Sequence, residues 1–154
     1  MIEVVEVQSH HLEAMHRWEM DETLQVKTGI EVPRTYEQFL DSYLSYSRGE
    51  KPHLWINVIE LDGEPIGKIE LYKTYIGIVL GSHRGEGYGA QALAKFIEKI
   101  KSQKELNHLS AEVYEDNPES INFFEKNSFR KTGNVTLERF RGRERKLIIL
   151  ERTL

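Results

Sequence analysis

The sequence predicts an α+β (mixed α/β) domain with a single twisted, mostly antiparallel sheet and helices on both faces. Strand-like runs alternate with amphipathic helical patterns along the chain. The central strands follow one another too closely for crossover connections, so they should pair antiparallel. One long helical pattern separates two later strands, which should therefore be parallel. With 154 residues and no repeat or linker, we expect one domain over residues 1–154.

The composition excludes several classes of protein. Hydrophobic residues make up 39% and charged residues 30%, so disorder is not expected. Because there is no cysteine, there is no disulfide framework, thiolate metal site or cysteine nucleophile. The start of the chain has no signal-peptide pattern and no apolar run reaches membrane-spanning length, so we expect a cytoplasmic protein without a membrane partner. The net charge of -4 argues against a nucleic-acid partner.

The first third of the chain predicts a strand followed by helices. A valine-rich run over residues 2–7 is typical of a strand. Ser9 is expected to cap a helix that ends where residues 21 to 33 form a loop or a short broken helix. Thr35 and Gln38 match the capping box at the start of another helix, and apolar residues follow at helical spacing.

The middle of the chain predicts three strands and the clearest helix. Residues 54–61 and 65–72 should pair across the turn dipeptide Asp62-Gly63. A short apolar strand is expected over residues 75–80. Residues 89–102 carry one apolar stripe with lysines and glutamates on the opposite side, as in an amphipathic helix.

The last third predicts a strand, a helix and a hairpin. Residues 109–114 form the strand, and Asn117 with Pro118 provides the cap and first position of a helix. Residues 129–140 and 144–153 should form the final hairpin. We expect the basic tip of this hairpin to be a solvated surface.

A glycine-rich turn joins the strand at 75–80 to the long helix. Gly85, Gly87 and Gly89 allow the backbone to approach a ligand closely. The amides of the first helical turn lack intrahelical partners, and the helix dipole favours an anion such as a pyrophosphate. Arg84 adds a positive charge. A merely structural turn and a dinucleotide fingerprint are the alternatives, although about 80 residues precede this turn, which is unlike a doubly wound sheet.

This turn and the later asparagine helix together resemble the GNAT superfamily of acetyltransferases. The run Arg84-Gly85-Glu86-Gly87-Tyr88-Gly89 is similar to the coenzyme A signature Q/R-x-x-G-x-G/A, and residues 117–129 resemble the family segment N-x-x-S/A-x-x-x-Y-x-K-x-G-F. The resemblance covers the whole chain. It implies a GNAT-like acyl-CoA N-acyltransferase fold and an N-acetyltransferase that moves acetyl from acetyl-CoA to a primary amine by direct attack.

The resemblance also implies where the cosubstrate binds. Pantetheine should lie between two diverging strands, against the backbone of residues 78–80. The glycine-rich turn should hold the pyrophosphate, and no metal is implied. The expected coenzyme-binding residues are Ile78, Val79, Leu80, Arg84, Gly85, Glu86, Gly87, Tyr88, Gly89, Ala90, Asn117, Ser120 and Phe124.

Two carboxylates are candidates for the base that deprotonates the amine. Glu112 is preferred because the stretch from Glu112 to Asn117 resembles the Glu-Val-x-x-x-Asn stretch of ribosomal-protein alanine N-acetyltransferases. Glu70 is the second candidate, and each could instead be an ordinary strand carboxylate. Phe124 stands where the family often has a tyrosine, so Tyr88, Tyr114 or a water would have to protonate the leaving thiolate. Ser128 replaces the usual glycine at a position that needs positive φ.

We expect the acceptor to be a small-molecule amine, a polyamine or a protein amino group. Acidic residues between positions 19 and 31 favour a cationic acceptor. An acyl-CoA-binding sensor or partner-binding module without turnover is the alternative function, and a homodimer stays open. The histidines give no metal motif. The acidic residues in question are Glu19, Asp21, Glu22 and Glu31, and the histidines are His10, His11 and His16.

Overall fold

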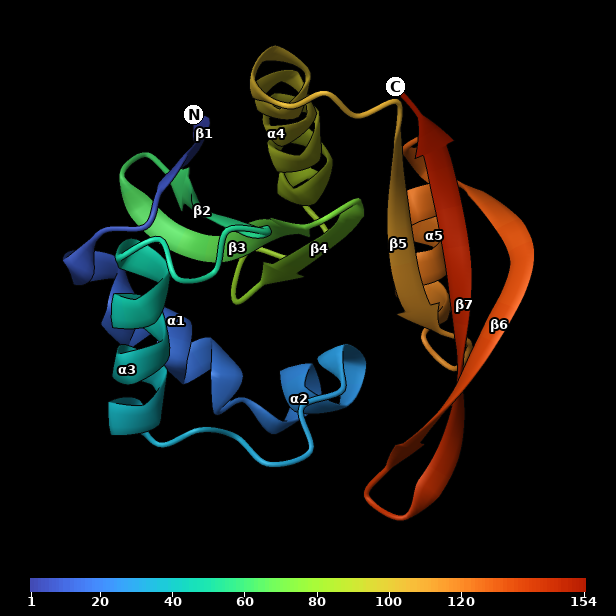
Figure 1. Ribbon diagram of the computed structural model, residues 1–154, viewed down its shortest axis with the longest axis horizontal. Helices are drawn as coiled ribbons and strands as arrows, with labels where there is room; N and C mark the ends of the chain where they lie inside the picture. Colours follow the sequence, from blue (N-terminus) through green and yellow to red (C-terminus); the bar gives the residue numbers. More distant parts are fainter.

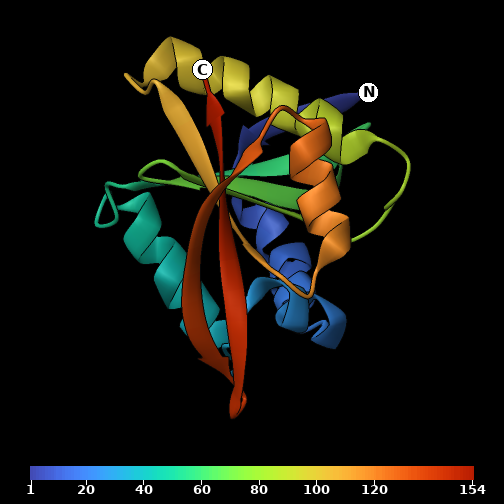
Figure 2. The same cartoon turned by 90° about the vertical axis from the view of Figure 1, so that its right-hand side faces the viewer.

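The computed structural model describes residues 1–154 and confirms the predicted class, a seven-stranded sheet with helices on both faces (Figures 1 and 2). The strand order is β1-β2-β3-β4-β5-β7-β6, and only β4 and β5 pair in parallel. The strands are β1 (Ile2–Glu6), β2 (Leu54–Leu61), β3 (Glu64–Tyr72), β4 (Tyr75–Leu80), β5 (His108–Tyr114), β6 (Arg130–Phe140) and β7 (Arg143–Thr153). The helices are η1 (Ser9–His11), α1 (Leu12–Glu19), α2 (Glu22–Thr28), α3 (Tyr36–Ser47), α4 (Tyr88–Gln103) and α5 (Pro118–Lys126).

The helices before β2 follow from local capping, with one exception. The predicted capping box is confirmed, since the Thr35 amide donates to Gln38 Oε1 at 3.0 Å and the Gln38 amide to Thr35 Oγ1 at 3.2 Å. The expected cap at Ser9 is wrong, because Ser9 begins a 3₁₀ turn and α1 begins only at Leu12. Asp21 caps α2 inside the segment expected to be a loop or broken helix. None of the helices combines the length and the apolar character that crossing a membrane would require.

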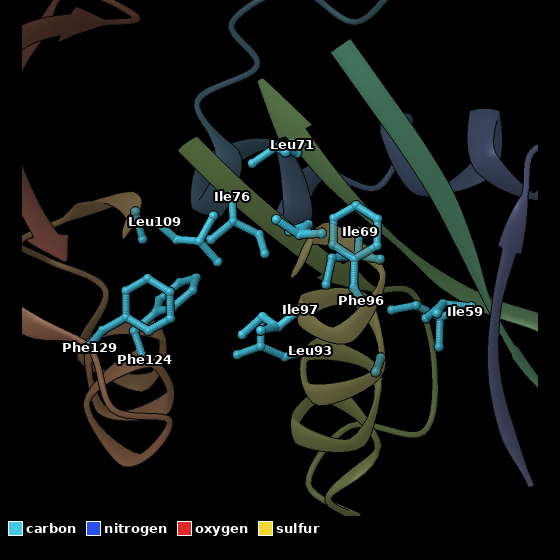
Figure 3. Close-up of a cluster of buried hydrophobic side chains, with 14 of the residues drawn as sticks. Ile59, Ile69, Leu71, Ile76, Leu93, Phe96, Ile97, Leu109, Phe124 and Phe129 are labelled. Carbon is cyan, nitrogen blue, oxygen red and sulfur yellow. The ribbon is translucent and has the colours of Figure 1, made fainter. Parts of the chain in front are cut away.

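The main core lies between the sheet and the pair α4 and α5. Figure 3 shows Leu93, Phe96 and Ile97 of α4 facing strand residues such as Ile69 and Ile76, all of them buried. The apolar stripe of α4 therefore points at the sheet, as its sequence spacing predicts. A smaller cluster packs beneath α1 and α3 on the other face. The two clusters thus cover opposite faces of the sheet.

The sheet divides between β4 and β5. Tyr75 and Ser110 are the only residues paired across this boundary, and the Ser110 amide donates to the Thr74 carbonyl at 2.8 Å. Beyond that point β4 stays with β3, while β5 stays with β7 along its whole length. In Figure 1, β2, β3 and β4 run across the view, whereas β5, β7 and β6 run nearly vertically. The backbone edge of β4 that faces β5 is thus without a strand partner after Tyr75.

Gly81, which follows β4, is required by the packing of Trp18. A Cβ at position 81 would lie 2.0 Å from Trp18 Nε1, which is closer than atoms can approach. We therefore predict that Gly81→Ala displaces the Trp18 ring and lowers the free energy of unfolding by about 1–3 kcal/mol, as overpacking does. Urea unfolding followed by tryptophan fluorescence measures both effects.

Gly77→Ala is the matched control for this substitution, because a Cβ there meets only Glu70 Cγ at 3.8 Å, an ordinary contact. Its stability should stay within about 0.5 kcal/mol of the wild type. Equal stability of the two variants would contradict the packing of Trp18 on Gly81.

Candidate active site

A cavity of about 620 Å³ opens where β4 and β5 diverge. Its walls come from both halves of the sheet, from α1 and α2, from the loop up to Arg34, and from the β6–β7 hairpin. The structure brings several predicted site residues together in this one cavity, and they are Glu70, Ile78, Val79, Glu112, Ser120 and Phe124. Leu80, the residues of the glycine-rich turn and Asn117 lie outside it.

The two candidate bases lie at one level across the sheet. Glu70 pairs with Gly77 across β3 and β4. Gly77 and Glu112 each come two residues after the pair formed by Tyr75 and Ser110, so they would face each other if the strands had not diverged. Because Gly77 has no side chain, the space between the two carboxylates is open.

The two carboxylates differ in their partners. Glu112 is exposed to the cavity and has no hydrogen bond or ion pair within the protein. Glu70 forms an ion pair with Lys68 at 3.7 Å. A carboxylate that must accept a proton from an incoming amine needs a free oxygen, and Glu112 has both oxygens free. Glu70 keeps one free oxygen, because only its Oε2 lies near Lys68.

Tyr114 places a phenol group at the β5 end of the cavity. Its hydroxyl donates to Glu138 Oε2 at 2.8 Å, and the Arg145 guanidinium stacks over its ring at 3.5 Å. Burial raises the pKa of Tyr114 to about 12, and the hydrogen bond to Glu138 acts in the same direction. The phenol is therefore protonated throughout the physiological range.

The raised pKa of Tyr114 has a consequence for alkaline stability. The fold favours the neutral phenol, so its contribution is complete below the ordinary pKa of 10.0 and is lost as the pH rises to about 12. We predict that Tyr114→Phe removes a tyrosinate absorbance step near pH 12 and flattens the fall in melting temperature above pH 10.

Tyr46→Phe is the control, since burial also raises the pKa of Tyr46 but that hydroxyl lies beneath α3. The step near pH 12 should persist in this variant. If it disappeared from the Tyr46 variant and stayed in the Tyr114 variant, the assignment would be wrong.

The β6–β7 hairpin closes the far side of the cavity by binding the α2 segment. Arg141 donates to Gln25 Oε1 at 2.9 Å and to the Ile30 carbonyl at 3.3 Å. Arg145 binds the Val26 carbonyl at 2.7 Å and pairs with Asp116. Most of the hairpin tip is exposed, as expected, but Arg141 and the buried Arg145 find partners more than 100 residues away in the chain.

Most of the acidic residues expected to attract a cationic acceptor form hydrogen bonds with other groups of the protein. Glu19 lines the cavity, but Arg34 donates to it through its backbone amide and its guanidinium. Burial opposes ionisation of Glu19, yet these hydrogen bonds outweigh it and lower the pKa of the carboxyl. Asp21 caps α2, and Glu31 accepts from the Arg141 amide. Besides Glu19, the carboxylates that line the cavity are Glu70, Glu112 and Glu138.

The glycine-rich turn has the conformation expected of an anion-binding segment. Gly85 and Gly87 have φ values of 77° and 83°, which glycine adopts without strain. Gly87 caps α4 without a side-chain hydrogen bond, so the first amides of the helix point outward without partners. Arg84 lies beside the turn, where its Nε donates to the Leu80 carbonyl at 2.9 Å.

Residues of α5 and its ends stabilise the fold, and some of them also line the cavity. Asn117 Oδ1 accepts from the Ser120 amide at 3.3 Å, so helix capping alone accounts for this asparagine. Phe124 is buried and packs edge-on against Phe129 with ring centroids 5.0 Å apart. Ser128 has φ of 72°, as expected at the usual glycine position.

The histidine cluster near α1 is structural. His10, His11 and Glu60 bring three potential metal ligands together. However, His11 Nδ1 accepts from the Gln8 amide at 2.9 Å, and its Nε2 lies 2.7 Å from Glu60 Oε2. Both ring nitrogens of this buried histidine are thus in use within the protein.

Three features together define the architecture of an acyl-CoA transferase. The sheet opens between the parallel strands β4 and β5, a glycine-rich turn follows β4, and the Glu112 carboxylate lies beside the opening. The chain belongs to the acetyltransferase (GNAT) family, whose sequence profile matches residues 12–129. The predicted enzyme class, an N-acetyltransferase, is thereby confirmed at the level of the family. A search of curated protein sequences gave no match.

Solved structures with the same fold share little sequence with this chain. Spermidine N-acetyltransferase from Vibrio cholerae, in complex with CoA and spermine, is 16% identical with a TM-score of 0.86, over 99% of this chain and 95% of that one. Ribosomal-protein-alanine N-acetyltransferase from Brucella melitensis is 18% identical with a TM-score of 0.79, and the match covers 100% of this chain and 99% of that one. AAC(6')-Ib, in complex with ribostamycin and coenzyme A, is 18% identical with a TM-score of 0.81, and the match covers 99% of this chain and 93% of that one.

Proposed function

We propose that this protein transfers an acetyl group from acetyl-CoA to a primary amine by direct attack. The observation that supports this most strongly is the unpaired Glu112 carboxylate at the opening between β4 and β5, within the fold of an acetyltransferase family. The sensor alternative rests on Phe124, which offers no hydroxyl at a position where a proton donor would be useful. We further propose that residues 1–154 act as one domain.

The residues present fit a coenzyme A molecule. The outward amides of Tyr88, Gly89 and Ala90 and the Arg84 guanidinium would bind the diphosphate. The free edge of β4 would hydrogen-bond the pantetheine amides, as a strand partner would. Several structural neighbours were crystallised with CoA, the spermidine N-acetyltransferase among them.

The proposed chemistry follows from the groups that line the cavity. Glu112 accepts a proton from the ammonium form of the acceptor, directly or through a water, and the neutral amine attacks the thioester carbonyl. A backbone amide on the free edge of β4 stabilises the negative charge on the carbonyl oxygen. The carbon–sulfur bond then breaks, the nitrogen releases its second proton to water, and acetyl remains on the nitrogen as an amide.

The leaving thiolate does not need Tyr114. A reference thiol has a pKa of about 8.5, whereas the pKa of Tyr114 is about 12. Proton transfer from this phenol to the thiolate would therefore be uphill. The thiolate can leave as the anion and be protonated by water, which is consistent with the buried Phe124 at the usual tyrosine position.

A thiol-release assay with acetyl-CoA and a panel of primary amines tests the proposal. We expect release of CoA that depends on the amine, with acetylated amine as the product by mass spectrometry. CoA binding without turnover on any amine would support the sensor instead. Tyr88→Phe is a useful companion variant, because unchanged turnover there would remove the other tyrosine considered as a proton donor.

A further inference from the structure

A second cavity lies next to the candidate active site along the sheet. It measures about 220 Å³ and lies beneath α3, against β2 and β3. It shares Met15, Arg34, Lys68 and Glu70 with the larger cavity. The two cavities are therefore neighbours along the sheet, the second on the side away from β5, with Lys68 and Glu70 at their junction.

The second cavity carries an excess of free hydrogen-bond donors. Lys51 lines it and has no ion pair, whereas Arg34 is neutralised by Glu19. Tyr46 accepts from the Ile56 amide at 2.9 Å, which leaves its own hydroxyl hydrogen free, and the Tyr43 hydroxyl has no partner within the protein. Lys68 at the junction is paired with Glu70, the one carboxylate of this cavity, so Lys51 and the two tyrosine hydroxyls are the free donors.

The opposite end of the combined site is acidic. Glu112 is unpaired, and Glu138 accepts a hydrogen bond only from the neutral Tyr114 phenol. Charge thus changes along the site, from carboxylates beside β5 and β6 to ammonium and hydroxyl groups beneath α3. An acceptor with ammonium groups at both ends would meet repulsion from Lys51, which lines only the second cavity and has no ion pair.

We propose that the acceptor is an amine whose other end carries a carboxylate. The amine lies over Gly77 near Glu112, and the carboxylate accepts from Lys51 and the tyrosine hydroxyls beneath α3. Ile56, Glu70 and Gly77 are partners across three neighbouring strands, so the span is about 10 Å at the usual strand spacing. Such a molecule is an ω-amino carboxylate or a short peptide. This inference rests on the proposed function and narrows its substrate.

Matched acceptors test this inference. For each chain length, kcat/KM is measured for an ω-amino carboxylate, the diamine and the plain alkylamine, with acetyl-CoA saturating. We expect the amino carboxylate to exceed the diamine at least tenfold at the best length. Equal values, or a preference for the diamine, would overturn the inference while turnover of any amine keeps the proposed function. Absence of turnover with every amine would remove both.

A charge reversal at Lys51 locates the effect. Lys51→Glu should lower the ratio of amino carboxylate to diamine at least tenfold, and Tyr43→Phe should lower it by a smaller factor. Lys131→Glu is the control, because Lys131 is exposed on β6 and lies outside both cavities. CoA affinity and melting temperature should be unchanged in all three variants. An unchanged ratio in folded Lys51→Glu would contradict the assignment of the second cavity to the carboxylate.

Discussion

Replacing Glu112 with glutamine lowers kcat at least tenfold near neutral pH, toward the ~10²- to 10⁴-fold contribution of a positioned base. Glutamine keeps the size and hydrogen-bonding reach of the side chain but cannot take the proton of the ammonium group. Because Glu112 is exposed and has no partner within the protein, its replacement breaks no ion pair or hydrogen bond. Stopped-flow or steady-state thiol release, with melting temperature as a check, measures the effect.

Glu70→Gln is the matched control, since both carboxylates line the same cavity at one level of the sheet. It should change kcat much less than the Glu112 substitution, and its loss of the Lys68 ion pair should appear mainly in KM. A wild-type rate in Glu112→Gln, with a large loss in Glu70→Gln, would transfer the role of base to Glu70.

Gly87→Asp weakens binding of CoA without unfolding the protein. Aspartate tolerates positive φ better than most residues, and a Cβ at position 87 meets no atom within 4 Å. The new carboxylate would lie where the diphosphate is expected, at the start of α4. Repulsion between unit charges about 4 Å apart costs about 1–4 kcal/mol, which corresponds to a roughly fivefold to thousandfold higher Kd.

Gly49→Asp controls for backbone strain. Gly49 has φ of 77° and equally open space around its Cβ position, but it follows α3 on the other face of the sheet. Both variants should lose similar stability, and only the position 87 variant should lose affinity for CoA. Equal affinities would show that the diphosphate does not bind at this turn.

Much of the fold could be predicted because it is encoded locally. The capping box at Thr35, the turn at Asp62-Gly63 and the apolar stripe of α4 each lie within a few residues and formed as expected. The prediction of a helix cap at Ser9 was wrong because contacts distant in the sequence decide the local structure there. The buried His11 binds the Gln8 amide and the Glu60 carboxylate, and a 3₁₀ turn forms instead.

The site could be predicted less completely, because its walls meet only in three dimensions. Arg34 and Glu138 line the cavity, yet neither belongs to a motif. The hairpin arginines have an ordinary exposed pattern in the sequence, but their partners lie in and after α2. β5 diverges from β4 because β4 pairs with β3 and β5 pairs with β7. The pairing of β5 with β7 joins segments far apart in the chain, so no short stretch of sequence predicts the divergence.

Calorimetric titration of purified protein with CoA tests the central claim most directly. The account predicts saturable heat with one CoA bound per chain and much weaker binding of pantetheine, which lacks the diphosphate that the turn after β4 should hold. Absence of heat with both CoA and acetyl-CoA, in protein shown to be folded, would contradict the account.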